Sequence, residues 1–383
     1  MKYNTYMLGD VCTFIDYRGK TPPKTSSGIP LITAKIIKNN VIQEPKEFID
    51  ESFYDEWMRR GIPKKGDVVF TTEAPLGEVA RITSDSKMAF AQRVIILEPN
   101  EDILDAGYLF YALQDRLLKN RILARSSGTT VFGIKSKELK KVEIDLPCLE
   151  IQRKISNVLL AIDEKISINN LINDNLQEQA QALYTNMFIQ NYSNQWAEGV
   201  LSDVAEIIMG QSPKGNTYNE DGVGTVFFQG RGEFGFRFPT RRLFTTDPKR
   251  MAQSNDVLMS VRAPVGDLNV AYEPCCIGRG LGAIRSINNH QSFVLYTVFS
   301  LRGKLDMFNG EGTVFGSINR DALNSMPIVI PTKKEMDRFE GIVAPMDAAI
   351  RNNYEEICHL EAIRDSLLPR LISGELDVSD IDL

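Results

Sequence analysis

Two segments of the chain carry apolar residues at alternating spacings of three and four. This pattern predicts a helix that buries one stripe along its length. One segment follows Pro147, the other follows Pro331, and they match at a constant offset of 184 residues. Because the spacing continues over several heptads, it favours a coiled-coil seam, with helices buried in their own domains as the alternative. We predict two long helices that pair along this seam, over residues 148–190 and 332–375.

The predicted seam contains amides where aliphatic side chains would be more stable. Asn169 and Asn173 lie in the first segment and Asn353 lies in the second. If the helices pair about their heptad centres, Asn173 faces Asn353. A buried amide pair costs stability but penalises slipped registers. We therefore interpret these three residues as determinants of helix register.

Outside the helices, the remaining sequence is a repeat of two copies. Peptides of the first copy recur in the same order in the second, which indicates duplication. The comparison places Lys35 opposite Arg231, and Arg93 roughly opposite Arg279. The clearest matches are "LGDVCTFI" (8–15) with "LSDVAEII" (201–208), "GDVVFTTEAPLGEVA" (66–80) with "NDVLMSVRAPVGDLN" (255–269), "YLFYAL" (108–113) with "FVLYTV" (293–298), and "GTTVFGIKSKEL" (128–139) with "GTVFGSINRDAL" (312–323).

Each copy has the pattern of a mixed α/β domain. Short β-branched runs such as "DVVFTT", "RVIILEP", "VEIDLP" and "DVLMSV" predict strands. Residues 105–123 have the periodicity of one helix. We predict two similar α/β domains, over 1–147 and 191–331, separated by the long helices and related as a pseudo-two-fold internal repeat. Residues 376–383 form an acidic tail.

The net charge of −6 at first argues against a nucleic-acid partner. The excess of acidic residues is uneven, however, because residues 332–383 hold six basic and twelve acidic side chains. Local patches therefore matter more than the total charge. The five cysteines are unpatterned and no apolar run is long enough for a membrane span, so we expect a reduced, cytoplasmic protein.

Motifs for catalysis are weak. "GRGEFG" (230–235) has the spacing of a dinucleotide-binding loop, but "FRFPTRR" follows it where a helix should begin. The sequence lacks the Asn-Pro-Pro-aromatic tetrapeptide of DNA methyltransferases and contains only two histidines. We expect no catalytic residue, no metal site and no cofactor bound by this chain.

Basic residues among turn formers and aromatics favour DNA contacts, since arginine can bind guanine through two hydrogen bonds and lysine can hold phosphate. Alternating Phe and Arg, as in residues 234–238, is also typical of an exposed strand over a core. The candidate DNA-binding residues are Arg18, Lys20, Lys24, Lys35 and Arg93 in the first copy, and Lys214, Arg231, Arg237, Arg241, Arg242, Arg262 and Arg279 in the second.

This organisation resembles the specificity subunit of type I restriction-modification enzymes. The resemblance covers essentially the whole chain and rests on the openings "LGDV" and "LSDVAEIIMGQSPKG", the two differing domains, and the helix start "PCLEIQRKI" (147–155). The second helix departs from that start, with "PTKKEMDRF" (331–339).

The resemblance implies a non-catalytic subunit that reads a bipartite, asymmetric DNA target with one half-site per domain. It also implies that the long helices pair antiparallel as a spacer. The expected partners are two methyltransferase (modification) subunits and restriction subunits. S-adenosylmethionine, ATP and Mg²⁺ would belong to those partners. The alternatives are a DNA methyltransferase that uses "GRGEFG", and a coiled-coil adaptor that binds protein.

Overall fold

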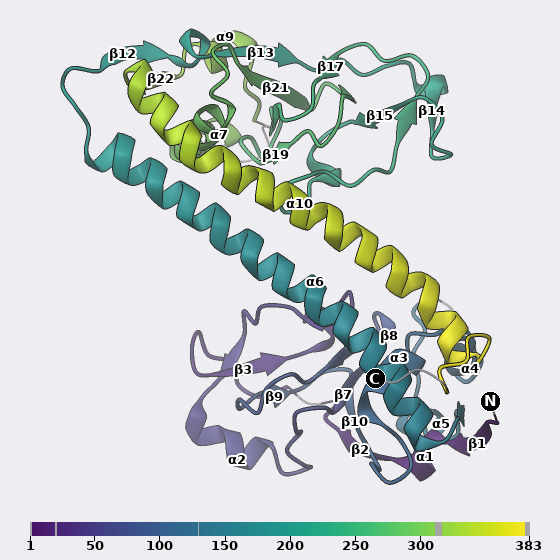
Figure 1. Cartoon of the computed structure of the whole chain (residues 1–383). Coiled ribbons are helices and arrows are strands. Elements are labelled where there is room, and N and C mark those ends of the chain that lie inside the picture. Colours follow the sequence, from purple (N-terminus) through teal and green to yellow (C-terminus); the bar gives the residue numbers. More distant parts are fainter. Residues whose placement is uncertain (1, 20, 129, 311–315, 380–383) are drawn as a thin grey trace. The chain divides into compact units, whose positions relative to one another are not determined.

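The structure is a computed structural model, and it describes residues 2–19, 21–128, 130–310 and 316–379. The chain divides into two compact units (Figure 1). Unit 1 comprises residues 1–168 with 356–383, and unit 2 comprises residues 169–355. Two long helices, α6 (Leu149–Tyr184) and α10 (Lys333–Ile372), each contribute to both units. No described helix is long and apolar enough to cross a membrane.

Unit 1 is built on an antiparallel four-stranded sheet of order β2-β10-β7-β8. A smaller sheet, β6-β3-β9, contains a parallel pair in which Ile32 lies opposite Phe90. The strands are β1 (Asn4–Met7), β2 (Cys12–Asp16), β3 (Ile29–Ile32), β4 (Ile37–Lys38), β5 (Val41–Ile42), β6 (Phe48–Ile49), β7 (Val68–Thr72), β8 (Leu76–Arg81), β9 (Ala89–Phe90), β10 (Val94–Pro99) and β11 (Glu143–Leu146). The short helices are α1 (Leu8–Val11), α2 (Tyr54–Trp57), α3 (Ala106–Ala112), α4 (Arg116–Ala124) and α5 (Ser136–Leu139).

Unit 2 repeats this plan. Its antiparallel sheet has the order β13-β21-β18-β19, and the second sheet again contains one parallel pair, with Phe228 opposite Ile277. The strands are β12 (Ala197–Val200), β13 (Ala205–Met209), β14 (Tyr218–Asn219), β15 (Thr225–Phe228), β16 (Phe244–Thr245), β17 (Met251–Ala252), β18 (Val257–Ser260), β19 (Leu268–Val270), β20 (Cys275–Ile277), β21 (Leu281–Ser286) and β22 (Pro327–Ile330). The short helices are α7 (Gln291–Ser300), α8 (Arg302–Asp306) and α9 (Arg320–Asn324).

The predicted single helix over residues 105–123 is wrong, because the chain forms α3 and α4 there. Asp115 separates them, and its carboxylate accepts a hydrogen bond from the Leu117 backbone N–H at 2.8 Å, which caps α4. An Asp at this position satisfies an N–H that has no partner within the new helix. Periodicity alone does not show such a break, because apolar spacing continues across it.

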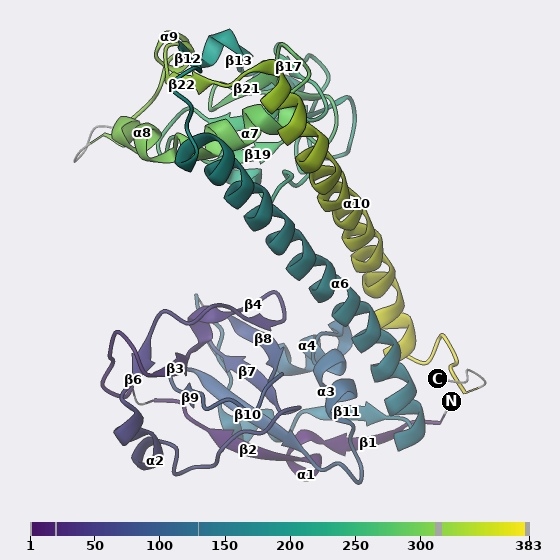
Figure 2. The same ribbon diagram turned by 60° about the vertical axis from the view of Figure 1, so that its left-hand side comes forward.

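Each domain packs against the long helices through one of its own helices, which is α3 in unit 1 and α7 in unit 2. In unit 1, α3 lies between the four-stranded sheet and α6 (Figure 2). Gly107 permits this approach, since a Cβ there would lie 2.8 Å from the Ser156 Cβ. In unit 2, the backbone N–H groups of Ser292 and Phe293 at the start of α7 donate to the Glu340 carboxylate on α10. Each domain is therefore held on the long helices by both apolar and polar contacts.

Within each unit, the segments of α6 and α10 are antiparallel. In unit 1, Asp163 pairs with Arg364 and Lys165 pairs with Glu356. In unit 2, Asn173 contacts Asn353, and Tyr184 stacks on Phe339 further along. Residues of increasing number on α6 therefore contact residues of decreasing number on α10. The antiparallel pairing that the family resemblance implies is therefore present within each unit.

Candidate nucleic-acid interface

Three loops of unit 2 meet where its strands end. Residues 210–214 follow β13, residues 229–231 follow β15, and residues 278–280 precede β21. The Gln211 N–H donates to the Ile277 carbonyl at 2.9 Å, and the Gly278 N–H donates to the Phe228 carbonyl at 2.8 Å. A Cβ on Gly210 would lie 2.1 Å from the Gly278 carbonyl oxygen. The loops thus pack backbone to backbone, and we call this surface the loop edge of unit 2.

Unit 1 has the same arrangement, formed by residues 17–19 with Thr21, residues 33–35, and residues 91–93. The Ala91 N–H donates to the Ile32 carbonyl at 3.0 Å, which matches the Gly278 bond of unit 2. The Gln92 side-chain amide donates to the Thr21 hydroxyl at 2.6 Å. We call this surface the loop edge of unit 1. The loops of the two edges have the same backbone arrangement but carry different side chains.

The strand registers allow the two loop edges to be compared residue by residue. Ile32 and Phe228 occupy the same place in their parallel pairs, so Lys35 corresponds to Arg231. Phe90 corresponds in the same way to Ile277, which places Gln92 opposite Arg279. The predicted match of Arg93 with Arg279 is therefore wrong by one residue, because insertions make the sequence offset drift between the elements.

Four candidate cations are exposed and form no ion pair within the described part of the chain. They are Lys35 on the loop edge of unit 1, Lys214 and Arg279 on that of unit 2, and Arg262 beside it. The Val261 N–H donates to the Gly280 carbonyl at 3.0 Å, which holds the turn of Arg262 against residues 278–280. These side chains are available to a phosphate or a base edge. Lys20 lies outside the described residues.

Six other candidates already bind carboxylates. The pairs are Arg18 with Asp16, Lys24 with Glu47, Arg93 with Glu73, Arg231 with Asp267, Arg241 with Glu273, and Arg242 with Glu233 and Glu220. Surface ion pairs of this kind are worth little in water, so DNA could exchange for the carboxylate. Such an exchange reduces the net gain from a phosphate contact. These six are weaker candidates than the four exposed cations.

Arg237 does not lie on the surface. It is 5% exposed, and its guanidinium donates to the Tyr296 hydroxyl at 2.9 Å and to the Asp347 carboxylate at 3.2 Å. Its predicted contact with DNA is therefore wrong in this conformation. The alternation of Phe and Arg that suggested a DNA contact instead places Arg237 and Phe238 inside while Phe236 remains 46% exposed.

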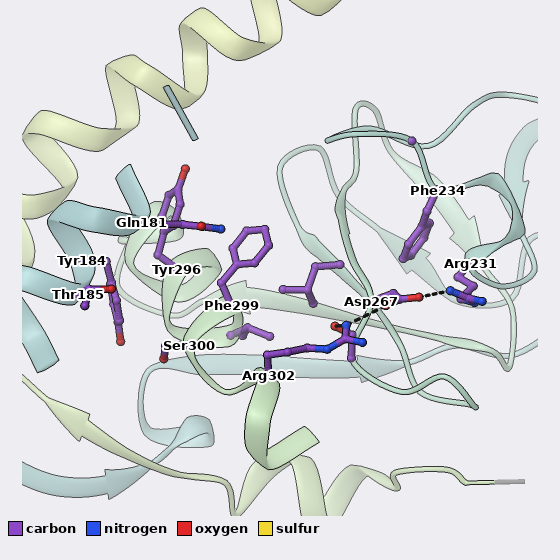
Figure 3. A pocket seen from close by; sticks show the side chains of 14 residues that line it. Gln181, Tyr184, Thr185, Arg231, Phe234, Asp267, Tyr296, Phe299, Ser300 and Arg302 are labelled. Carbon is purple, nitrogen blue, oxygen red and sulfur yellow. Dashed lines mark hydrogen bonds and ion pairs between the residues drawn. The ribbon is translucent and has the colours of Figure 1, made fainter. Parts of the chain in front are cut away.

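A hollow of about 570 Å³ lies beside the loop edge of unit 2. Figure 3 shows Arg231 and Arg302 both reaching Asp267 at this hollow, and Arg302 lies 2.8 Å from the carboxylate. Burial alone raises the pKa of Asp267, but hydrogen bonds from Arg302 and Arg231 outweigh it and lower the pKa below its usual range. Arg302 also pairs with Asp306, so the two arginines and two carboxylates of this group balance in charge.

Two lysines that the sequence analysis did not select accompany Lys35. Lys35, Lys38 and Lys46 line a separate hollow in unit 1, together with Glu44 and Glu47. The spacing of Lys35 and Lys38 by three residues was a signal for this cluster. We did not predict the cluster, because Ile36 and Ile37 between the two lysines resemble part of a plain apolar run. Lys46 follows the hairpin of β4 and β5 in the chain. Its distance from Lys35 in the sequence gave no sign that the two side chains would line one hollow.

The loop "GRGEFG" has no helix N-terminus to receive a phosphate. Only a single 3-10 turn, Arg231–Glu233, forms inside it, and the chain then reaches Pro239, which faces Phe234 across an isolated bridge. A dinucleotide or S-adenosylmethionine site of this type requires a helix to begin at the last glycine. The residues present therefore do not fit that cofactor.

The seam amides lie between the long helices. The Asn353 amide donates to the Asn173 carbonyl oxygen at 2.8 Å, and Asn173 is 2% exposed. Asn169 is 1% exposed. A buried, satisfied amide pair is compatible with the predicted role in register, and that role stays a prediction.

Comparison with known proteins identifies the family. A family model described as the type I restriction modification DNA specificity domain matches residues 1–178 and 193–357. The MjaX specificity subunit of a type I restriction enzyme from Methanocaldococcus jannaschii is 28% identical and is aligned over 93% of this chain and 89% of its own length. The MjaIX specificity subunit from the same organism is 25% identical, over 92% of this chain and 88% of its own.

A solved structure has the same fold. The S subunit of a type I restriction-modification system from M. genitalium superposes with a TM-score of 0.64 at 16% identity, over 97% of this chain and 96% of that one. The two family matches coincide with the two copies of the repeat. The chain belongs to the type I restriction modification DNA specificity family, as a specificity subunit and not an enzyme.

Proposed function

We propose that each unit reads one half of a bipartite DNA target through its loop edge. The observation that carries the proposal is that the two edges share one backbone arrangement but differ in exposed side chains. Lys35 and Gln92 of unit 1 correspond to Arg231 and Arg279 of unit 2. Arginine suits guanine and glutamine suits adenine, so the two half-sites differ in sequence. The target is therefore asymmetric.

The long helices act as the spacer between the half-sites. Helix α6 contains 36 residues and α10 contains 40. At 1.5 Å per residue each is roughly 50–60 Å long, comparable to somewhat more than one turn of duplex DNA. Bases between the half-sites remain unread, and the length of the helices sets their number.

The chain works with other subunits. Because the recognition units are duplicated, they offer two equivalent surfaces, which suits two methyltransferase subunits, joined by restriction subunits for cleavage. S-adenosylmethionine, ATP and Mg²⁺ then belong to these partners, in keeping with the poor fit of "GRGEFG" to a cofactor. Few free cations occupy the loop edges, so the partners supply much of the phosphate affinity. The complex of this chain with its partners works in the cytoplasm, where the unpaired cysteines stay reduced.

The decisive experiment is to map methylated bases across the genome of a host that expresses this chain with its methyltransferase partner. We expect two short, different half-sites separated by an unread spacer of fixed length. A continuous palindrome would refute the model of two readers. Binding of S-adenosylmethionine by the purified chain would favour a methyltransferase instead, and a complex with no sequence-dependent DNA binding would favour an adaptor.

A further inference from the structure

A partly buried polar cluster joins the recognition domain of unit 1 to the long helices. The Tyr111 hydroxyl on α3 donates to the Asp163 carboxylate on α6 at 2.6 Å. The other oxygen of that carboxylate accepts from the Arg364 guanidinium on α10 at 2.9 Å. Tyr111 is fully buried, at 0% exposure. One carboxylate thus connects three elements.

Unit 2 contains the same link. The Tyr296 hydroxyl on α7 donates to the Asp347 carboxylate on α10 at 3.0 Å, and Tyr296 is 1% exposed. Tyr111 and Tyr296 occupy the same place in "YLFYAL" and "FVLYTV". Asp163 and Asp347 are related by the constant offset of the two helical segments. The pair has therefore been kept in both copies.

The arginine that completes each cluster comes from a different place. In unit 1 it is Arg364 of α10, whereas in unit 2 it is Arg237, which belongs to the recognition domain and not to a long helix. The position of the first helix that corresponds to Arg364 is Ala180, which carries no charge. The two copies thus supply the counter-charge independently and retain only the Tyr–Asp hydrogen bond. This pattern suggests that the hydrogen bond itself is what both copies need.

The chemistry of the pair suits a contact that fixes position. Burial raises the pKa of both tyrosine hydroxyls, so each remains a protonated donor. Apolar contacts between α3 and α6, or between α7 and α10, tolerate small rotations of one element on the other. A hydrogen bond to a carboxylate is directional, and a buried tyrosine hydroxyl that misses its carboxylate is left without an acceptor.

We propose that Tyr111–Asp163 and Tyr296–Asp347 are positioning contacts that set the rotation of each recognition domain on the helix pair, and thereby the spacing and phase of the half-sites. The inference rests on the proposed function, because it concerns how two readers are held at a fixed separation. It goes beyond that function by assigning the separation to residues outside the loop edges and outside the Asn173–Asn353 seam.

The test uses the complete complex with the methyltransferase partner and a pool of DNA duplexes. All duplexes carry the wild-type half-sites, and their spacers differ by single base pairs. Methylation of every spacer length is measured in competition for the wild type, Tyr111→Phe and Tyr296→Phe. The matched control is Tyr108→Phe, which removes another buried hydroxyl from α3, but one that contacts the Asp145 carbonyl within the domain at 3.3 Å.

We expect the preference of Tyr111→Phe and Tyr296→Phe for the wild-type spacer over its neighbours to fall by about tenfold, the factor that one hydrogen bond to a charged group is worth. The half-site sequences should not change, and Tyr108→Phe should keep the wild-type preference. Asp163→Asn, which keeps the shape and removes the charge, should lose the preference as Tyr111→Phe does.

The inference is overturned if Tyr111→Phe and Tyr296→Phe keep the wild-type preference, or if methylation falls equally for all spacers, as a purely structural role would predict. A wild-type complex with no spacer preference at all would refute the proposed function, and the inference with it. The two failures are therefore distinguishable in the same experiment.

Discussion

The side-chain amide of Asn353 donates to Asn173 across the seam of the long helices, at 2.8 Å. The surrounding seam is aliphatic and aromatic, with Ile350 and Ala180 both at 0% exposure. An amide pair in such a place is weaker than two leucines, but it is satisfied in only one register. The contact therefore gives the helix pair a defined alignment at a cost in stability.

Replacing both amides should separate these two effects. We expect Asn173→Leu with Asn353→Leu to raise the free energy of unfolding by about 1–2 kcal/mol, because apolar packing replaces a desolvated polar pair. The tolerance for altered spacer length should increase at the same time. Asn353→Leu alone, which leaves the buried Asn173 unpaired, should lower the free energy of unfolding by about 1–3 kcal/mol. Calorimetry and methylation of spacer variants measure the two effects, and an unchanged spacer preference in the double variant would argue against a role in register.

Arg237 should behave as a structural residue. Arg237→Met leaves the Asp347 carboxylate without its guanidinium, and we expect the free energy of unfolding to fall by about 3 kcal/mol. The dependence of DNA affinity on salt should stay that of the wild type, because no phosphate contact is lost. Chemical denaturation and salt titrations test both points. A shallower salt dependence with unchanged stability would place Arg237 at the DNA after all.

Exposed cations of the loop edge should show the opposite behaviour. Arg279→Ala and Lys214→Ala should each leave stability within about 0.5 kcal/mol of the wild type. If each side chain contacts a phosphate, the slope of log affinity against log salt for the assembled complex should fall by about one. The exposed Lys119 of α4, which belongs to neither loop edge as defined above, provides the control variant Lys119→Ala. An unaltered slope for both loop-edge variants would exclude them from phosphate contacts.

The cluster around Asp267 gives a pH dependence of known sign. The pKa of Asp267 is lowered in the folded state, so its carboxylate contributes stability above the ordinary value of 3.8. This contribution disappears as pH falls through the folded-state pKa. We expect Asp267→Asn to lower the melting temperature most near pH 7 and progressively less below about pH 4. A difference that is independent of pH would show that the ionised carboxylate is not what stabilises the cluster.

The sequence predicted those features that depend on periodicity and repetition. The heptads predicted the two long helices, and the facing of Asn173 and Asn353 followed from counting once the helices were taken to be antiparallel. The repeat predicted that Lys35 and Arg231 would correspond, as the strand registers show. Both results follow from patterns that persist over many residues and survive local exceptions.

Side-chain burial and long-range pairing were beyond the sequence. Arg237 has the composition of a DNA-binding loop around it, yet it pairs with Asp347, 110 positions away. Tyr111 and Asp163 each appear unremarkable in their own segment, and only the packing of α3 on α6 brings them together. Ion pairs such as Arg93 with Glu73 likewise depend on which loops meet, and this is decided by strand order.

The central claim is that each unit reads its own half of the target, and two point variants test it most directly. Lys35→Ala alters the loop edge of unit 1, and Arg279→Ala alters that of unit 2. With the methyltransferase partner present, genome-wide methylation maps should show relaxed sequence preference in one half-site for the first variant and in the other half-site for the second. If both variants relaxed the sequence preference in the same half-site, the assignment of one reader to each unit would be contradicted.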